Sequence, residues 1–299
     1  MTPSGGQDTM TTRLRGWPPL VALPLLVVVL TPASVPRWAF MWLLAFAIFC
    51  GCKWLTWRRG PAIHAAPLWR HLAYLVAWPG LDARAFLLAP PPARPTPTEW
   101  AAATARLAAG AALYWGVARL AVDLPYLAGW VGMVGLIMML HFGSMHLMSC
   151  AWRAVGVDAR PLMQRPLAST SLAEFWGRRW NTAFRDLTHR YLFKPLTRRM
   201  RPGVALLVGF LFSGVIHDAV ISLPAGGGYG GPTAFFAIQA LGIVAERSAA
   251  AKRLGLGRGP IGWAFAMVLL AGPACLLFHP PFVERIIVPF MQAIGALPT

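Results

Sequence analysis

An ionisable side chain lies deep inside an apolar stretch of this sequence. Residues 203–223 are long enough to span a membrane as a helix and hold no Lys or Arg, yet they include His217. A rise of about 1.5 Å per residue places His217 roughly 21 Å into that helix. Because a titratable group at such depth is costly, His217 is a candidate for function. The alternative interpretation is a histidine that hydrogen-bonds a neighbouring helix.

The residues next to His217 limit what it can contact. Gly209 and Ser213 lie on the same helical face at successive steps of four, which leaves room for another helix or an acyl chain beside the imidazole. Asp218 is the next residue, and adjacent side chains on a helix point about 100° apart. The sequence therefore does not predict a dyad of His217 with Asp218. Gln239 and Glu246 are seven residues apart on the next apolar segment and share a face, so either could orient His217 if the two helices pack together.

Motifs for metal or nucleotide chemistry do not occur in the sequence. His141 and His146 are five residues apart and do not share a helical face well, and the four cysteines form no CxxC pair. The sequence also has no HExxH, P-loop, GxSxG or DxxxD pattern. We therefore predict no metal site and no bound cofactor.

A basic segment precedes the histidine. Residues 153–202 hold 11 of the 27 Lys and Arg residues. Ser171 and Glu174 have the S-x-x-E spacing of a capping box, which predicts the start of an amphipathic helix. Its apolar face would carry Trp176, Trp180, Ala183, Phe184, Leu187 and Tyr191, and its polar face Glu174, Arg178, Asn181, Arg185 and Thr188. Periodicity alone also fits a solvated loop whose aromatic residues anchor it among lipid headgroups.

The composition excludes most soluble classes. Of the 299 residues, 57% are hydrophobic and 12% are charged, against about 25% charged in a soluble domain. The net charge of +17 is typical of nucleic-acid binding in a soluble protein, but in so apolar a chain it indicates cytoplasmic loops and lipid headgroups. We therefore expect an all-α, polytopic membrane protein of about 7–9 spans in a single membrane domain over 1–299, with no nucleic-acid partner.

Eight apolar segments and four basic clusters define the expected topology. Residues 64–99 are broken by prolines and are placed at the interface or as a re-entrant segment. The expected spans are 17–31, 37–56, 101–122, 127–150, 203–223, 232–247, 260–278 and, weakly, 282–297. All basic clusters then fall on the cytoplasmic side: Arg13 and Arg15; Lys53, Arg58, Arg59 and Arg70; residues 153–202; and Arg247, Lys252, Arg253 and Arg258. The preference for Arg over Lys and the abundance of Ala, Gly and Pro indicate a GC-rich genome and, with it, a bacterial inner membrane.

Two strings of residues resemble a known family. An F-W-x-x-x-W-N string at 175–181 is followed by S-G-x-x-H at 213–217, with further similarity at 191–196 and 74–82. In these strings the chain resembles the wax synthase branch of the membrane-bound O-acyltransferases. The similarity extends over about 160–246, which would be the catalytic core. Relatives often have Glu after the histidine, where this chain has Asp218.

The resemblance implies roles for individual residues. It implies that His217 is the catalytic base and that Asn181 is its polar partner, which donates to the oxygen that becomes negative. Arg178, Arg179, Arg185 and Lys194 would then bind the phosphates of acyl-CoA, and each of them is otherwise an ordinary cytoplasmic charge. Trp176 and Trp180 would line the same substrate site. Supporting roles fall to Ser213, Asp218, Gln239 and Glu246.

The expected reaction is transfer of a fatty acyl group from acyl-CoA, as co-substrate, to a long-chain alcohol or another lipid hydroxyl. An acceptor of sterol, terpenoid or glycan type remains open, since the chain is shorter than many members of the superfamily. A different class is a transporter or scramblase in which His217, Asp218 and Glu246 form a proton or headgroup path. A third is a non-catalytic membrane scaffold.

Overall fold

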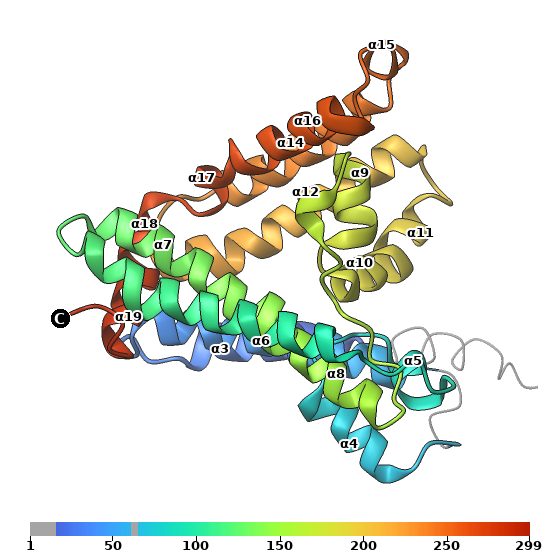
Figure 1. Ribbon diagram of the computed structural model, residues 1–299, viewed down its shortest axis with the longest axis horizontal. Coiled ribbons are helices and arrows are strands. Elements are labelled where there is room, and N and C mark those ends of the chain that lie inside the picture. The colour runs from blue at the N-terminus through green and yellow to red at the C-terminus, as the bar shows by residue number, and fades with distance from the viewer. Residues whose placement is uncertain (1–15, 61–64) are drawn as a thin grey trace, which may run out of the picture.

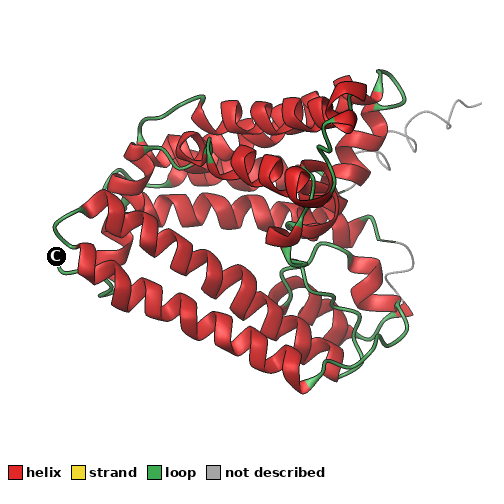
Figure 2. Cartoon of the chain, turned by 45° about the horizontal axis from the view of Figure 1, so that its top comes forward, coloured by secondary structure: helices red, strands yellow, loops and turns green. Residues whose placement is uncertain are grey.

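Helices make up all of the regular structure that is described. The computed structural model describes residues 16–60 and 65–299, and every regular element within those two ranges is helical (Figure 2). The predicted all-α fold is therefore confirmed for these residues. The predicted basic pair Arg13 and Arg15 lies outside them.

Four helical runs are long and apolar enough to cross a membrane, and two shorter apolar helices accompany them. The long runs are Arg37–Arg58, Pro125–Ala154, Pro202–Ala225 and Gly259–Leu277, and the shorter helices are Pro18–Leu30 and Gly231–Glu246. In order these are α3 (Arg37–Arg58); α7 (Pro125–Ile137), η4 (Met138–Ser144) and α8 (Met145–Ala154); α12 (Pro202–His217), η8 (Asp218–Ser222) and α13 (Leu223–Ala225); α16 (Gly259–Ala271) and α17 (Ala274–Leu277); and α2 (Pro18–Leu30) and α14 (Gly231–Glu246).

Two of the eight expected spans are not among these apolar helices. In the expected span 101–122, α6 (Pro97–Ala111) gives way to the π-helical η2 (Ala112–Gly116) and the 3-10 helix η3 (Val117–Ala121). The expected span 282–297 is divided into α18 (Pro280–Phe282), η9 (Val283–Ile287) and α19 (Val288–Ala293), because prolines start two of these pieces. Its η9 and α19 pack against α7, and Ile286 and Met291 are fully buried. The count of seven to nine spans is therefore not established by helix length.

The proline-broken connection between α3 and α6 contains a short amphipathic helix. In α4 (Leu68–Ala77) the side chains of Leu68, Trp69, Leu72 and Val76 are exposed, whereas those of His71 and Tyr74 are buried. After it comes α5 (Ala83–Leu88), which is capped by Asp82. An exposed apolar face on a helix too short to span is typical of an interfacial position, as the sequence predicts.

The sequence predicts Lys53 in a basic connection between spans, but the structure places it elsewhere. It lies within α3 and is buried, and its Nζ donates to Trp78 O at 2.7 Å and also to Gly80 O. The same Nζ lies 3.5 Å from the centre of the Tyr74 ring. Lys53 therefore joins α3 to the segment after α4 and is not a solvated charge, because carbonyl oxygens and a ring face replace its water.

The basic clusters of the described residues lie toward one end of the molecule, whereas Arg37, Arg119 and Arg285 lie near the other. Figure 1 shows α5, α11 (Lys194–Leu196) and α15 (Ala249–Arg253) at the same end, while α18 and α19 lie at the opposite end. The helices that carry the basic segments therefore point them in one direction, as an orientation set by positive charge requires.

The segment between α8 and α12 packs on the α12–α14 pair. Its elements are η5 (Pro166–Ala168), α9 (Leu172–Glu174), η6 (Phe175–Arg179), α10 (Thr182–Thr188), η7 (His189–Phe193) and α11. The backbones of α12 and α14 approach closely at Gly214, where an added Cβ would lie 2.6 Å from Thr233 Cα. Leu172, Ile243 and Ala266 form a buried apolar cluster beneath α9. This cluster joins the basic segment to α14 and α16.

Candidate active site

The imidazole of His217 has a defined orientation. Its Nδ1 lies 2.7 Å from the carbonyl oxygen of Ser213, one helical turn earlier. Because a carbonyl oxygen only accepts hydrogen bonds, Nδ1 carries the hydrogen and Nε2 has the free lone pair. In the described part of the chain no side chain is hydrogen-bonded to Nε2. A neutral histidine in this tautomer is able to accept a proton from a substrate hydroxyl.

Space lies beside this helix face. A Cβ added at Gly209, two turns before His217, would meet no atom within 4 Å. The expected room next to the histidine is therefore present at Gly209, whereas Gly214 is closed by α14.

Phe236 of α14 connects His217 to the F-W-x-x-x-W-N string. The His217 and Phe236 rings have centroids 4.5 Å apart, and the Trp176 and Phe236 rings are 5.6 Å apart. Trp176 also meets Phe210 of α12 edge-on at 5.7 Å. The structure therefore places Trp176 in the same aromatic group as His217, as a site residue would be.

Gln239 holds Trp176 and does not orient His217. The indole Nε1 of Trp176 donates to Gln239 Oε1 at 3.3 Å, and Gln239 Nε2 donates to Leu269 O at 2.7 Å. Gln239 is fully buried, so both of its amide atoms depend on these partners. Gln239 and Glu246 are both buried on α14, in agreement with the shared face, but Gln239 is not the residue that orients His217.

Glu246 caps the start of α9. Its two carboxylate oxygens accept from the backbone N–H groups of Leu172 and Ala173, each at 2.8 Å. The side chain is buried, and a carboxylate that accepts two N–H groups at a helix start is well stabilised. Glu246 therefore positions the string that carries Trp176, and it is not hydrogen-bonded to His217.

Asp218 holds the start of α14 and is not paired with His217. Its Oδ1 accepts from Gly230 N and Ser222 Oγ, both at 2.9 Å. Its Oδ2 accepts from Thr233 N at 3.1 Å and Thr233 Oγ1 at 2.5 Å. All of these donors belong to the α12–α14 connection, so this carboxylate fixes the angle between the two helices.

His279 extends this network and was not singled out in the sequence. The backbone N–H of Phe282 donates to its Nδ1 at 3.2 Å, so Nε2 carries the hydrogen and donates to Ser222 Oγ at 3.1 Å. Burial lowers the pKa of His279, which favours this neutral form. The two prolines that follow His279 are the sequence feature that marks it as the residue before a helix start.

The predicted amphipathic helix from Ser171 is broken at Trp180 and Asn181. Its capping box forms in part, because Ser171 Oγ accepts from Glu174 N at 2.9 Å, while the Glu174 carboxylate accepts from Thr170 N at 2.8 Å. The π-helical η6 then ends at Trp180, whose backbone is extended, and Asn181 adopts the left-handed conformation with φ 40°. Asparagine tolerates that conformation better than most residues.

Asn181 begins the next helix and does not contact His217. Its Oδ1 accepts from Phe184 N at 3.4 Å, which makes it the N-cap of α10. Because this contact uses the amide oxygen, the two N–H groups of Nδ2 are left as donors. No hydrogen bond joins Asn181 to His217, although both are among the described residues.

Trp180 packs against the span that precedes the basic segment. Its ring stacks on Phe175 at 5.5 Å and on His141 at 5.9 Å, with interplanar angles of 12° and 18°. The two tryptophans of the string therefore point to different helices, Trp176 toward α12 and α14 and Trp180 toward η4. Helical periodicity places them on one face, and the turn at Asn181 and the π-helical turn account for the difference.

Two of the four cations expected to bind phosphate are already in ion pairs with carboxylates. Arg179 Nη2 lies 2.7 Å from Glu174 Oε1, and Arg185 Nη2 lies 2.6 Å from Asp186 Oδ1. Arg185 also donates to Gly177 O at 2.8 Å. These two arginines stabilise the fold of the segment itself.

Arg178 and Lys194 are the other two expected cations. Both side chains are exposed, and neither is in an ion pair with any of the described residues. Of the expected set, these two remain able to meet an anionic ligand.

The carboxylate of Glu174 is held in its charged form. Burial opposes ionisation, but hydrogen bonds from Thr170 and Arg179 outweigh it and lower the pKa of Glu174 below its usual value. The Glu174–Arg179 pair therefore stays ionised through the neutral range and closes the turn that carries Trp176.

A separate polar group lies between α6 and α8. Ligand-type atoms of Glu99, His146 and Cys150 lie within 4.8 Å of one another. Arg153 Nη2 is 2.6 Å from Glu99 Oε1, and its hydrogen bonds lower the pKa of Glu99 although burial opposes this. The guanidinium already neutralises the carboxylate, so the geometry is that of a salt bridge between helices.

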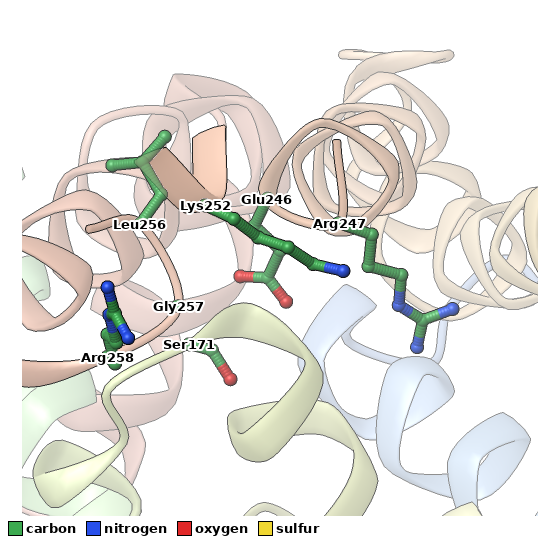
Figure 3. Close-up of a pocket in the computed structure, with 7 residues that line it drawn as sticks. All are labelled: Ser171, Glu246, Arg247, Lys252, Leu256, Gly257 and Arg258. Atoms are coloured by element: carbon green, nitrogen blue, oxygen red, sulfur yellow. The ribbon is translucent and has the colours of Figure 1, made fainter. Parts of the chain in front are cut away.

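A pocket opens next to Ser171 and Glu246. It has a volume of about 360 Å³ and is lined by Ser171, Glu246, Arg247, Lys252, Leu256, Gly257 and Arg258 (Figure 3). It lies where α14, α15 and the start of α16 meet the capped end of α9. Its basic residues belong to the cluster for which the sequence predicts only a role in topology.

The central segment of the chain is similar to known proteins. Residues 159–238, which include Asn181 and His217, match the Membrane bound O-acyl transferase family. The chain is 32% identical over 149 residues to "Probable long-chain-alcohol O-fatty-acyltransferase 7" of Arabidopsis thaliana, a match that covers 44% of this chain and 42% of that protein. It is 38% identical over 72 residues to the "Long-chain-alcohol O-fatty-acyltransferase" of Simmondsia chinensis, covering 21% of this chain and 20% of that protein.

These matches confirm the resemblance to the wax synthase branch that the two motifs indicate. The matched region spans less than half the length of either relative. The family match ends before Gln239, so Glu246 and the basic residues of the pocket lie outside it, whereas Ser171 lies inside it.

Proposed function

We propose that this chain is a membrane-bound O-acyltransferase that transfers a fatty acyl group from acyl-CoA to a long-chain alcohol, giving a wax ester. The observation that carries the proposal is His217, whose Nδ1 donates to Ser213 O and whose Nε2 is free inside an apolar helical run. The names of the relatives support the choice of acceptor, since both refer to a long-chain alcohol.

In the proposed mechanism His217 is the general base. Its Nε2 takes the hydroxyl proton of the alcohol as the oxygen attacks the thioester carbonyl carbon. The tetrahedral intermediate collapses with cleavage of the carbon–sulfur bond, and the imidazolium returns the proton to the leaving thiolate. The products are an ester and CoA, and His217 is neutral again. The hydrogen bond from Nδ1 to Ser213 O keeps the ring in place throughout.

Asn181 would stabilise the negative oxygen of the intermediate. Its Oδ1 is occupied by Phe184 N, so Nδ2 offers two N–H groups to an incoming carbonyl. The side chain would approach the thioester once substrate is bound. Trp176, on the Phe236 ring beside His217, would form part of the wall against which the acyl chain lies.

The transport alternative receives less support. It requires Asp218 and Glu246 to accept and release protons in sequence with His217. Both carboxylates instead accept two or more hydrogen bonds from donors at helix starts, so both are engaged in holding the fold.

Topology and location are further parts of the proposal. Seven to nine crossings would require the shorter helices α2 and α14 and the interrupted run 97–121 to cross as well. The position in a bacterial inner membrane rests on composition alone, and the plant origin of the relatives does not support it.

The test is an ester assay with competing acceptors. Membranes that contain the protein would be given labelled acyl-CoA with a long-chain alcohol, a sterol, a terpenoid alcohol or a sugar. We expect labelled wax ester and free CoA in equal amounts, with the long-chain alcohol preferred. Ester made only from another acceptor would change the substrate class, and proton or lipid flux without any ester would favour the transporter.

A further inference from the structure

Three cations surround the pocket beside Glu246 without carboxylate partners. Arg247 follows the last residue of α14, Lys252 lies in α15, and Arg258 precedes α16. All three side chains are exposed, and in the part of the chain that the structure describes none of them takes part in an ion pair. In Figure 3 they surround Ser171 and Glu246 from different sides. Cations that converge on a hollow without an acidic partner favour an anionic ligand.

Glu246 is the one carboxylate among the residues that line the pocket, and it already accepts hydrogen bonds. Both oxygens of Glu246 accept backbone N–H groups, from Leu172 and Ala173, so it forms part of the base of the pocket. It offsets one of the three positive charges and leaves two. An anion of about two negative charges would balance the remainder, which is the charge of a phosphate monoester at neutral pH.

The base and the rim of the pocket supply further groups for such a ligand. Ser171 Oγ accepts from Glu174 N, so its own hydrogen is available to donate. Gly257, on the rim, has φ +85°, a backbone conformation that residues other than glycine rarely adopt. With no side chain there, the backbone permits close approach. The volume of about 360 Å³ is within the range of about 300–1,000 Å³ for small-molecule sites.

We propose that this pocket binds a phosphate ester group. The assignment rests on the proposed function only for its preferred source of phosphate, the nucleotide part of the acyl donor. An anionic lipid headgroup has the same chemistry and is the other source. Because Glu246 joins the pocket to the backbone of α9, a ligand here would lie at the start of α9, shortly before Trp176 in the chain. Arg179 and Arg185, which the sequence favoured for this role, are committed to Glu174 and Asp186.

The experiment measures binding without turnover. The full chain in phosphatidylcholine nanodiscs would be titrated with adenosine 3′,5′-bisphosphate, and in a second arm phosphatidate would be introduced into the nanodiscs. The test variant combines Arg247→Gln, Lys252→Gln and Arg258→Gln. The matched control is Arg253→Gln, because Arg253 is an exposed cation of the same short helix that does not line the pocket.

We expect saturable binding in at least one arm. The triple variant should weaken it by about tenfold or more, since hydrogen bonds between charged groups are the stronger ones, and the control should change it less than twofold. Binding of the soluble bisphosphate alone identifies nucleotide phosphate, and binding of phosphatidate alone identifies a headgroup.

The proposal is overturned if neither probe binds saturably, if the triple variant binds like the wild type, or if Arg253→Gln loses as much. A protein that makes ester but fails this test contradicts the pocket alone. A protein that binds the probe but makes no ester contradicts the proposed function alone.

Discussion

The indole Nε1 of Trp176 donates a hydrogen bond to Oε1 of Gln239 at 3.3 Å, and the same indole shares the Phe236 ring with His217. A buried amide on α14 thus determines where the first tryptophan of the F-W-x-x-x-W-N string lies. The string is held in place from the neighbouring helix, and its own periodicity does not fix its position.

Replacement of Trp176 by Phe should destabilise the protein. The smaller ring leaves Oε1 of the buried Gln239 without its donor, which costs about 1–3 kcal/mol. The measurement is the thermal unfolding midpoint of the purified protein in detergent. Trp180→Phe is the matched control, because Trp180 stacks on Phe175 and His141 and no hydrogen bond of its indole is lost. An equal change in the two variants would mean that the hydrogen bond is unimportant.

Glu246→Gln should loosen the start of α9. A glutamine oxygen can accept from Leu172 N or Ala173 N, but its amide group then faces the other N–H as a second donor. We expect a loss of about 1–3 kcal/mol in unfolding free energy. Hydrogen exchange at the amides of Leu172 and Ala173 would measure it locally. Glu284→Gln, at an exposed carboxylate, supplies the comparison, and unchanged exchange in Glu246→Gln would refute the capping role.

Asp218→Asn should lower stability at the start of α14. The asparagine amide would face donors at Gly230 and Thr233, and lost hydrogen bonds to a charged group cost about 1.5–3 kcal/mol each. Hydrogen exchange at the amides of Gly230 and Thr233 should therefore be faster in the variant than in the wild type. Unchanged exchange at both amides would contradict this role of Asp218.

Stability should fall at low pH partly through Glu174. Its folded pKa is lowered, so the stabilisation is fully present above the unfolded value of about 4.3 and is lost as the pH falls through the folded pKa. Thermal midpoints measured from pH 7 down to pH 3 should therefore drop more steeply for the wild type than for Glu174→Gln. Parallel curves would contradict this role for the Thr170 and Arg179 hydrogen bonds.

Gly209→Leu should block long acyl chains and leave the fold intact. A Cβ at Gly209 meets no atom within 4 Å, so the protein itself has room for the side chain. A bound acyl chain would have to make way, and overpacking costs about 1–3 kcal/mol, or about tenfold and more in kcat/KM. Short-chain acyl-CoA should be less affected. Gly203→Leu, equally open on the same helix, is the control, and identical kinetics for the two variants would contradict an acyl path along Gly209.

The sequence predicts local features of this structure well. The apolar run around His217, the N-cap at Ser171 and the shared face of Gln239 and Glu246 all follow from composition and spacing within a few residues. Each depends on contacts within one or two helical turns, which periodicity describes directly.

The hydrogen bonds between residues far apart in the sequence could not be predicted. Glu246 bonds Leu172, 74 residues away, and His279 reaches Ser222 across 57 residues. The turn at Asn181 could not be predicted either. An asparagine in the left-handed conformation cannot be distinguished in the sequence from an asparagine inside a helix. Such features depend on which helices pack together, and the residue spacing leaves that undetermined.

The most direct test of the central claim compares His217→Ala with His189→Ala in the ester assay. His189 is an exposed histidine in the same family-matched segment, so the control removes the same side chain away from the proposed base. With both variants inserted to the wild-type level, His217→Ala should lose about 10²–10⁴-fold in ester formation, the usual contribution of a general base, while His189→Ala should stay near the wild type. Ester formation by His217→Ala within about twofold of the wild type would contradict the role of His217 as the general base.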